Sequence, residues 1–385
     1  MLSCEKKYIL KLLNAIISGT MVSPEEDIDW VELKKITDMQ NISGLVASKI
    51  FKLNPEFKPC NYSDWHFSML NTVRLMGKKF ADFEFIRNKL SVAGINFICL
   101  KGIVIKDYYP ICELRTMGDF DIFIRDEQVE TVANTFDANG YELFRQPLCL
   151  TFVNKFGTNF EVFTTLKEEF DKNTVFYDEM VRKKSVKWYD NVYRMDDTTL
   201  FAHCIIHSAK HFFSKGCGVR YLVDAAIIYK KMGGTIAVDE VYDMCAVQGY
   251  GKFCCYIFGA LNKYFGFKFD TNIDDEMIDI FVNDILEFGV FGKIVENDIF
   301  VPHLVNQNNG KMNGIRRVFF PPASMISHKY MYLKKCRCLL PFAWMHRFFY
   351  AVLKKHYTVN RLFKNYKYAL NYYDDRKAII KKLDM

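Results

Sequence analysis

The chain has 385 residues, with 52 lysines and arginines against 45 aspartates and glutamates; half of the residues are apolar and 16% are aromatic. This composition excludes a disordered chain, because so much large apolar surface drives folding, and the length allows two or three domains. No apolar run is long enough to cross a bilayer. Twelve cysteines without a CxxC pair or regular spacing indicate reduced thiols, and therefore a cytoplasmic protein rather than a disulfide scaffold.

The basic residues are concentrated at the C-terminal end. Residues 311–385 carry 17 lysines and arginines against 3 acidic residues, so the rest of the chain is net acidic. Apolar stretches among these cations predict folded helices, with lysine and arginine on outward faces and aromatic rings packed inward. A nucleic-acid partner is compatible with the charge but is not favoured, because no RNA-binding signature is present.

Taken in chain order, the periodicity predicts a helical region, a mixed α/β core, a second helical region and a basic helical extension, with boundaries at 1–92, 93–195, 196–305 and 306–385. Glycine and proline positions delimit the elements of the middle part. They are a long helix over 64–94, a strand over 95–102, a helix over 103–110, a strand over 114–124, a helix over 126–140 and a hairpin over 149–166 with a turn at Gly157.

The strand "LRTMGDFDIFI" over 114–124 carries acidic residues on one face. Phe120 and Ile122 alternate with Asp119 and Asp121, whose Cα atoms lie about 7 Å apart along an extended strand. Two carboxylates on one face repel each other, and a cation between them relieves the repulsion. Oxygen ligands of this kind suit Mg²⁺, which binds through one or two carboxylates together with substrate phosphates.

Further polar residues are candidates for the same site. Glu161 has the strand parity that would let it join Asp119 and Asp121 if its strand lies beside theirs. Lys101 and Gly102 lie where a strand meets a helix, and there glycine permits close backbone approach while the helix start offers N–H groups to an anion. Arg115 could grip a phosphate with two parallel hydrogen bonds.

A histidine face is predicted in the second helical region, where His203, His207 and His211 follow one another at four-residue spacing. We interpret it as a packed or hydrogen-bonded face, with Asp224 as a candidate partner, rather than as a zinc site, because the glutamate of a helical protease motif is missing. Arg220 is assigned a structural or phosphate-facing role rather than a catalytic one.

These motifs together resemble a known family. The stretches "LKGIVIKDYYPICELRTMGDFDIFI", "NGYEL" and "NFEVF" are similar to the uncharacterised nucleotidyltransferase family of bacteria, a branch of the polymerase-beta-like superfamily. That family shows Leu-Lys-Gly, then Tyr-Pro, Arg, Asp-x-Asp and Gly-Tyr. The helical stretches "TTLFAHCIIHSAKH", "GVRYLVDAAII" and "LLPFAW" also resemble it, so the likeness runs from about residue 95 to 350.

The resemblance implies an α+β fold, with a minimal nucleotidyltransferase core between helical regions. It implies that Asp119 and Asp121 hold one or two Mg²⁺ ions, and that Glu161 is a third metal ligand or the base on the acceptor hydroxyl. Gly102 would lie against the triphosphate. The superfamily's usual Gly-Ser is absent here, so Lys101 and Arg115 would replace its phosphate contact.

The function implied is Mg²⁺-dependent transfer of a nucleoside monophosphate from an NTP, such as ATP, to an acceptor hydroxyl on a small molecule, a protein or an RNA end. The alternative is a catalytically weak nucleotide-binding or interaction protein that keeps the fold. Phe163, which stands where family members often carry histidine, argues for the alternative, and retention of the three acids argues against it. Convergence of the three carboxylates in one open cleft discriminates between the two, because a Glu161 that points away or a plugged cleft would favour the alternative.

Overall fold

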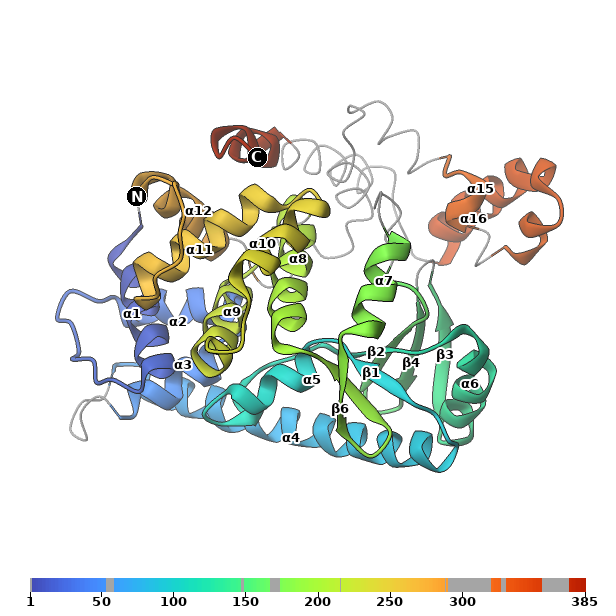
Figure 1. Cartoon of the computed structure of the whole chain (residues 1–385), viewed down its shortest axis with the longest axis horizontal. Helices are drawn as coiled ribbons and strands as arrows, with labels where there is room; N and C mark the ends of the chain where they lie inside the picture. The colour runs from blue at the N-terminus through green and yellow to red at the C-terminus, as the bar shows by residue number, and fades with distance from the viewer. Residues whose placement is uncertain are drawn as a thin grey trace. The chain divides into compact units, whose positions relative to one another are not determined.

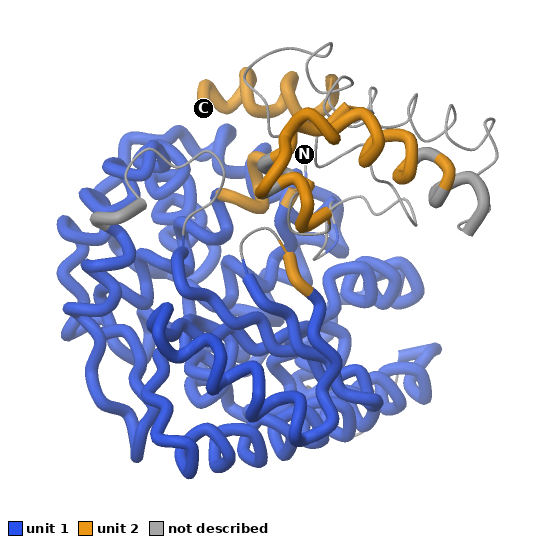
Figure 2. Tube along the Cα trace, turned by 90° about the vertical axis from the view of Figure 1, so that its right-hand side faces the viewer, with its two compact units in different colours: residues 1–144, 148–209, 217–290 blue, residues 145–147, 210–216, 291–385 orange. Residues whose placement is uncertain are grey.

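The structure is a computed structural model, and the parts of the chain that it describes are residues 2–52, 59–146, 149–166, 174–214, 216–287, 289, 320–326, 330–354 and 374–385. The chain divides into two compact units, coloured separately in Figure 2. Unit 1 comprises Met1–Phe144, Leu148–Ala209 and Cys217–Val290, and unit 2 comprises Arg145–Pro147, Lys210–Gly216 and Phe291–Met385. The domain boundaries expected from the sequence stay a prediction.

The N-terminal part of unit 1 is helical, as the sequence predicts. Its helices are α1 (Cys4–Ser18), α2 (Trp30–Met39), α3 (Ser43–Ile50) and α4 (Tyr62–Val92). Ser3 and Asp29 cap the first two by accepting hydrogen bonds from backbone N–H groups of the opening turn. The long helix α4 stops where Gly94 adopts a φ of 72°, a conformation that glycine tolerates best.

One mixed sheet of seven strands forms the centre of unit 1 among the described residues (Figure 1). Strand β2 lies between β5, to which it is parallel, and β1, to which it is antiparallel. The order across the sheet is β3-β4-β5-β2-β1-β7-β6. The strands are β1 (Phe97–Cys99), β2 (Asp119–Phe123), β3 (Tyr141–Arg145), β4 (Leu150–Asn154), β5 (Asn159–Phe163), β6 (Ser185–Tyr189) and β7 (Val192–Met195).

One face of this sheet is packed with aromatic rings. Phe120 and Phe160 are each 1% exposed, and their ring centroids lie 5.1 Å apart. Phe83 of α4 packs on Phe120, and Phe136 of α6 (Val129–Ala138) packs on Phe160, each at 5.1 Å. Helices α4 and α6 therefore cover this face, and side-chain alternation sends the acids of β2 to the opposite face.

The sheet contains two hairpins, of which the sequence analysis predicted one. The predicted hairpin is β4–β5, whose turn holds Gly157 at a φ of 80°. The hairpin β6–β7 was not predicted. Its loop is Asp190-Asn191, with Asp190 in the left-handed region at a φ of 44°. The signal was a short alternating run, Val-Lys-Trp-Tyr, followed by turn-forming residues.

Helices fill the rest of unit 1 and parts of unit 2. In chain order they are α5 (Gly102–Ile105), α7 (Thr174–Lys183), α8 (Asp197–Ser214), α9 (Val219–Met232), α10 (Val238–Val247), α11 (Gly251–Phe265), α12 (Asp275–Glu287), α15 (Ala323–Ile326), α16 (Leu340–Lys354) and a helix over 374–382. Helix α8 begins in unit 1 and ends in unit 2. Short 3-10 turns lie at Lys106–Tyr108, Cys112–Leu114, Asp126–Gln128, Met331–Lys334 and Arg337–Leu339. Of the helices described, none combines the length and apolar character that crossing a membrane requires.

The basic C-terminal end contains helices, as expected, but its aromatic rings are not all turned inward. In α16, Phe342 and Phe349 are 64% and 54% exposed, while Ala343 of the same helix is fully buried. The expectation of an inward aromatic face is therefore wrong for these two rings. A small cluster of Ile326, Tyr330, Leu333 and Ala343 is the buried core that α16 helps to form.

The aromatic cluster under the acid-bearing strands gives a first prediction. Phe160→Ala should lower the free energy of unfolding of unit 1 by about 3–5 kcal/mol, because it leaves a cavity among rings that cannot collapse to fill it. Phe156→Ala, in the β4–β5 turn and 62% exposed, is the control and should change it by less than about 0.5 kcal/mol. Urea denaturation followed by far-UV circular dichroism measures both. Equal effects of the two substitutions would contradict the assignment of this core.

Candidate functional site

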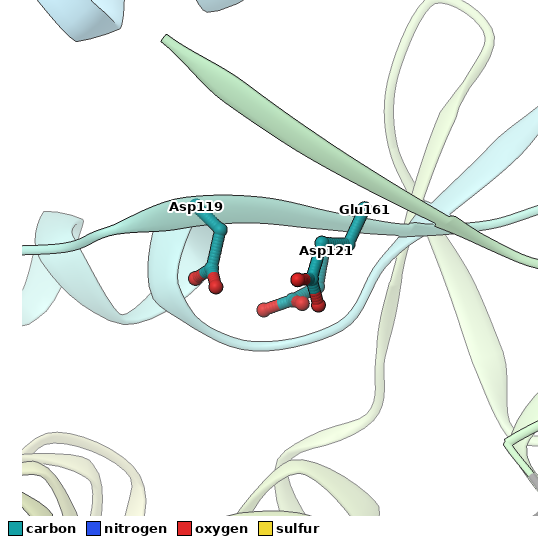
Figure 3. A group of neighbouring side chains, drawn as sticks. All are labelled: Asp119, Asp121 and Glu161. Atoms are coloured by element: carbon teal, nitrogen blue, oxygen red, sulfur yellow. The ribbon is translucent and has the colours of Figure 1, made fainter. Parts of the chain in front are cut away.

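Three acidic side chains converge on the face of the sheet opposite α4 and α6 (Figure 3). The parallel register between β2 and β5 places Glu161 directly beside Asp121, and Asp119 beside Asn159. One carboxylate oxygen from each of Asp119, Asp121 and Glu161 lies within 4.8 Å of the other two. The expected convergence of the three acids is therefore confirmed.

The shared face raises the proton affinity of these acids. Burial raises the pKa of Asp121 to about 6 against the opposing effect of Lys101, and Asp121 is only 5% exposed. Burial, with the charges of Asp121 and Asp119, raises the pKa of Glu161 to about 7. Concentrated, partly desolvated negative charge on hard oxygen donors is the donor set that a divalent cation such as Mg²⁺ requires. The residues present therefore fit a metal site.

Lys101 places a positive charge beside the acids. Its Nζ lies 3.2 Å from Asp121 Oδ2 and 3.0 Å from His207 Nε2 on α8. Burial alone would lower the pKa of Lys101, but Asp121 and Asp119 raise it overall, so the ammonium stays charged. The lysine therefore connects the sheet with the helical part of unit 1.

Arg115 is held by a buried carboxylate. Its Nε and Nη2 donate to the two oxygens of Asp224 on α9, at 2.9 and 2.8 Å, and both side chains are about 5% exposed or less. Tyr109 donates a further hydrogen bond to Asp224, at 2.8 Å. A buried guanidinium needs such a partner. The guanidinium of Arg115 is therefore engaged by Asp224, and the phosphate contact expected from the sequence stays a prediction.

Two more contacts hold the loop that leads into β2. Arg220 of α9 donates to the carbonyl oxygen of Thr116 at 2.8 Å. Lys79 of α4 donates to the carbonyl oxygens of Met117 and Gly118, at 3.0 and 2.8 Å. Burial lowers the pKa of Lys79, and the nearby Asp119 opposes this. The loop before the acids is thus fixed from α4 and α9 together.

Gly102 is required by a close approach within this network. A Cβ atom at this position would lie 3.0 Å from Nη1 of Arg115 and 3.6 Å from the sulfur of Met117. An added methyl group would therefore press on the buried guanidinium. The glycine opens α5 immediately after Lys101.

The histidine face contacts other side chains. His203 Nδ1 lies 2.7 Å from the hydroxyl of Tyr177, and His207 contacts Lys101 as described. His211 lies in the last turn of α8. Asp224, the candidate partner for these histidines, is instead taken by Arg115 and Tyr109. Among the described residues, the group of three or more potential ligands that could hold a metal ion is the acid triad.

Sequence reasoning missed Lys79, and it did not give His207 or Asp224 the partners that they have in this site. Lys79 carried no signal, because a lysine in a long helix is read as solvated. His207 was interpreted with its own helix face and not with Lys101. The Arg-x-x-x-Asp spacing of Arg220 and Asp224 was a usable signal, because residues four apart lie on one side of a helix. That side of α9 contacts the loop before β2, through Thr116 and Arg115.

The comparisons with known proteins agree with this geometry. The family model described as uncharacterised nucleotidyltransferase matches residues 26–266, which is more than half of the chain. The matched range includes helices α2 to α4, the sheet and helices α7 to α11, and therefore every residue of the site described above. Neither the search of curated proteins nor that of solved structures gives a match.

The buried pair yields a prediction about stability. Asp224→Asn leaves the Arg115 charge buried without a counter-charge, so it should lower the free energy of unfolding by about 3–5 kcal/mol. Glu32→Gln removes the acid of an exposed ion pair with Lys35 and should cost at most about 1 kcal/mol. Urea titrations of both variants and the wild type make the comparison. Similar losses would show that the buried Arg115–Asp224 pair does not constrain the fold.

A third prediction concerns the pH dependence of stability in the absence of metal. The folded state raises the pKa of Glu161 from its ordinary 4.5 to about 7, so between these values the folded protein binds more protons than the unfolded chain. Stability should then fall as pH rises from about 4.5 to 7 and level off above. Glu161→Gln removes this loss of stability. The melting temperature of the variant should therefore rise relative to that of the wild type as the pH increases from about 4.5 to 7. Glu130→Gln, exposed on α6, is the control and should track the wild type.

Proposed function

Because the chain belongs to the uncharacterised nucleotidyltransferase family, we propose that it is a Mg²⁺-dependent enzyme that moves a nucleoside monophosphate from an NTP to an acceptor hydroxyl. The observation that carries this proposal is the convergence of Asp119, Asp121 and Glu161 on one face of the sheet. Three carboxylates within 4.8 Å of one another repel each other and lower the stability of the fold. A bound cation relieves this repulsion, so the arrangement suits a protein that binds one.

The three acids have distinct places in this proposal. Asp119 and Asp121 hold the metal, and Glu161 is either the third ligand or the base that accepts the proton of the acceptor hydroxyl. When bound, Mg²⁺ supplies charge neutralisation of the phosphates and stabilises the departing pyrophosphate. The loop anchored by Arg115, Arg220 and Lys79 keeps the two aspartates in position, so that the geometry is set before substrate arrives.

Lys101 and Gly102 are proposed to meet the triphosphate. The Lys101 ammonium stands 3.2 Å from Asp121, beside the place where metal-bound phosphates would lie. When a metal takes over the charge of Asp121, the lysine is released from that pair and can donate to a phosphate oxygen. Arg115 acts behind Gly102 as a positioning residue, since its Nη1 lies next to this glycine.

A second candidate is a nucleotide-binding protein with weak catalysis. The observation in its favour is Phe163, which follows Glu161 by two residues on the same strand and is paired with Phe123 in the sheet. An aromatic ring cannot move a proton as the family's histidine could. This candidate predicts metal and NTP binding without transfer.

The transfer reaction can be tested with α-labelled NTPs, Mg²⁺ and a cell extract. The wild type should label a component of the extract, and Asp121→Asn should reduce the rate about a hundredfold or more, the scale of losing one electrostatic contact in a transition state. Asp137→Asn, exposed on α6 at the opposite face of the sheet, is the matched control and should leave the rate unchanged.

Metal binding is measured separately by melting temperature. Mg²⁺ should raise that of the wild type and of Asp137→Asn, and should have little effect on Asp121→Asn. Stabilisation by Mg²⁺ and NTP without any labelled product would favour the binding candidate. No stabilisation by Mg²⁺ in the wild type would remove both candidates, since each requires the acids to bind metal.

A further inference from the structure

A cavity of about 440 Å³ lies where strand β1 begins and strand β2 ends, away from the three acids along the strand. Its lining comes from β1, the end of β2, the 3-10 turn at Asp126–Gln128, helix α7 and the hairpin β6–β7. This volume is in the range of pockets that hold small molecules.

The apolar floor of the cavity belongs to the acid-bearing face of the sheet. Phe123 follows Asp121 by two residues in β2, so both side chains point to the same face. Ile98 is paired with Phe123 and with Tyr193, and residues paired across neighbouring strands share a face. A molecule in the cavity would therefore lie one strand repeat, about 7 Å of backbone, beyond Asp121.

One wall of the cavity is a preorganised arginine. The guanidinium carbon of Arg182 lies 3.8 Å from the ring centroid of Phe123, and its Nη2 donates to the carbonyl oxygens of Ile124 and Thr164, at 2.8 and 3.2 Å. These contacts use one of its nitrogens. Within the described part of the chain, Arg182 has no carboxylate at ion-pair distance, and its Nε and Nη1 donate to no protein acceptor.

A second arginine stands at the rim. The side chain of Arg125 is 72% exposed, and its recorded carboxylate contact is Glu127, at 3.8 Å. Burial lowers the pKa of Arg182 and the charge of Arg125 adds to this effect, while the charges of Asp178, Asp126 and Glu127 oppose it. Gln128 accepts a hydrogen bond from the Arg125 backbone N–H through Oε1, which leaves its amide N–H groups available. The lining thus offers more donors and positive charge than its one carboxylate balances.

We propose that this cavity is a binding site for a small molecule carrying an oxyanion group, either phosphate or carboxylate, held between Arg182 and Arg125 with its apolar part against Tyr193, since the Phe123 ring is buried beneath the Arg182 guanidinium. The planar guanidinium of Arg182 is fixed in advance by its carbonyl contacts, so little conformational entropy is lost when it binds the anion. This site is separate from the acid triad, and it does not depend on the transfer reaction.

The test is calorimetric titration of the full chain with inorganic phosphate and, separately, with malonate. Saturable binding of at least one anion is expected, and the tighter of the two identifies the source of the oxyanion. Arg125→Gln should weaken binding and Glu127→Gln should strengthen it, each about two- to fivefold, the scale of one exposed charge. Arg182→Lys keeps the charge and loses the planar fork, so it should also weaken binding.

Opposite effects at Arg125 and Glu127 cannot come from loss of folding, and melting temperatures of all variants check this for Arg182→Lys. Arg74→Gln removes an exposed arginine on α4 outside the cavity, and is the matched control for the loss of one positive charge. Absence of saturable binding of either anion would overturn the proposal. So would binding that responds to Arg125→Gln and Glu127→Gln in the same way as to Arg74→Gln, because the anion would then lie elsewhere.

Discussion

The buried ion pair between Arg115 and Asp224 is the contact on which the site depends. It joins the loop before strand β2 to helix α9, and Tyr109 completes it with a hydrogen bond to the same carboxylate. Because a lone charge at such depth is costly, the two elements are held to each other. Gly102 belongs to the same constraint, since a side chain there would press on the guanidinium. Gly102, Tyr109 and Arg115, which follow one another within 14 positions of the sequence, thus belong to one packed unit with Asp224.

The three acids of the site lower the stability of the fold by their mutual repulsion, and neighbouring side chains offset part of this cost. The sheet register brings Asp121 and Glu161 side by side, and burial makes each of them harder to ionise. Lys101 balances part of this charge at Asp121, and Lys79 holds the backbone just before Asp119. The result is a site whose remaining negative charge is suited to a cation, on a support built from α4, α9 and the aromatic side of the sheet.

The two faces of the sheet carry different side chains, because successive residues of a strand point to opposite faces. Phe120 and Phe160 pack under α4 and α6, which leaves Asp119, Asp121, Phe123 and Glu161 on the other face. Acids occupy one part of that face, and an apolar floor flanked by two arginines occupies another. Because both lie along the same strand, the three acids and the arginine-flanked cavity are neighbours on one face of the sheet.

The sequence by itself determined the local features of this protein. The alternation in β2 fixes Asp119 and Asp121 on one face, Gly157 fixes the turn of the β4–β5 hairpin, and Gly94 ends α4, because each depends only on residues a few positions apart. The sequence also gave Glu161 the right parity, but only the pairing of β5 with β2 placed it beside Asp121. For Arg115, residue type suggested a phosphate, whereas the fold supplied Asp224, which lies more than a hundred positions away. Which buried charge meets which, and which strands become neighbours, is decided by packing the whole chain, and no local pattern contains that information.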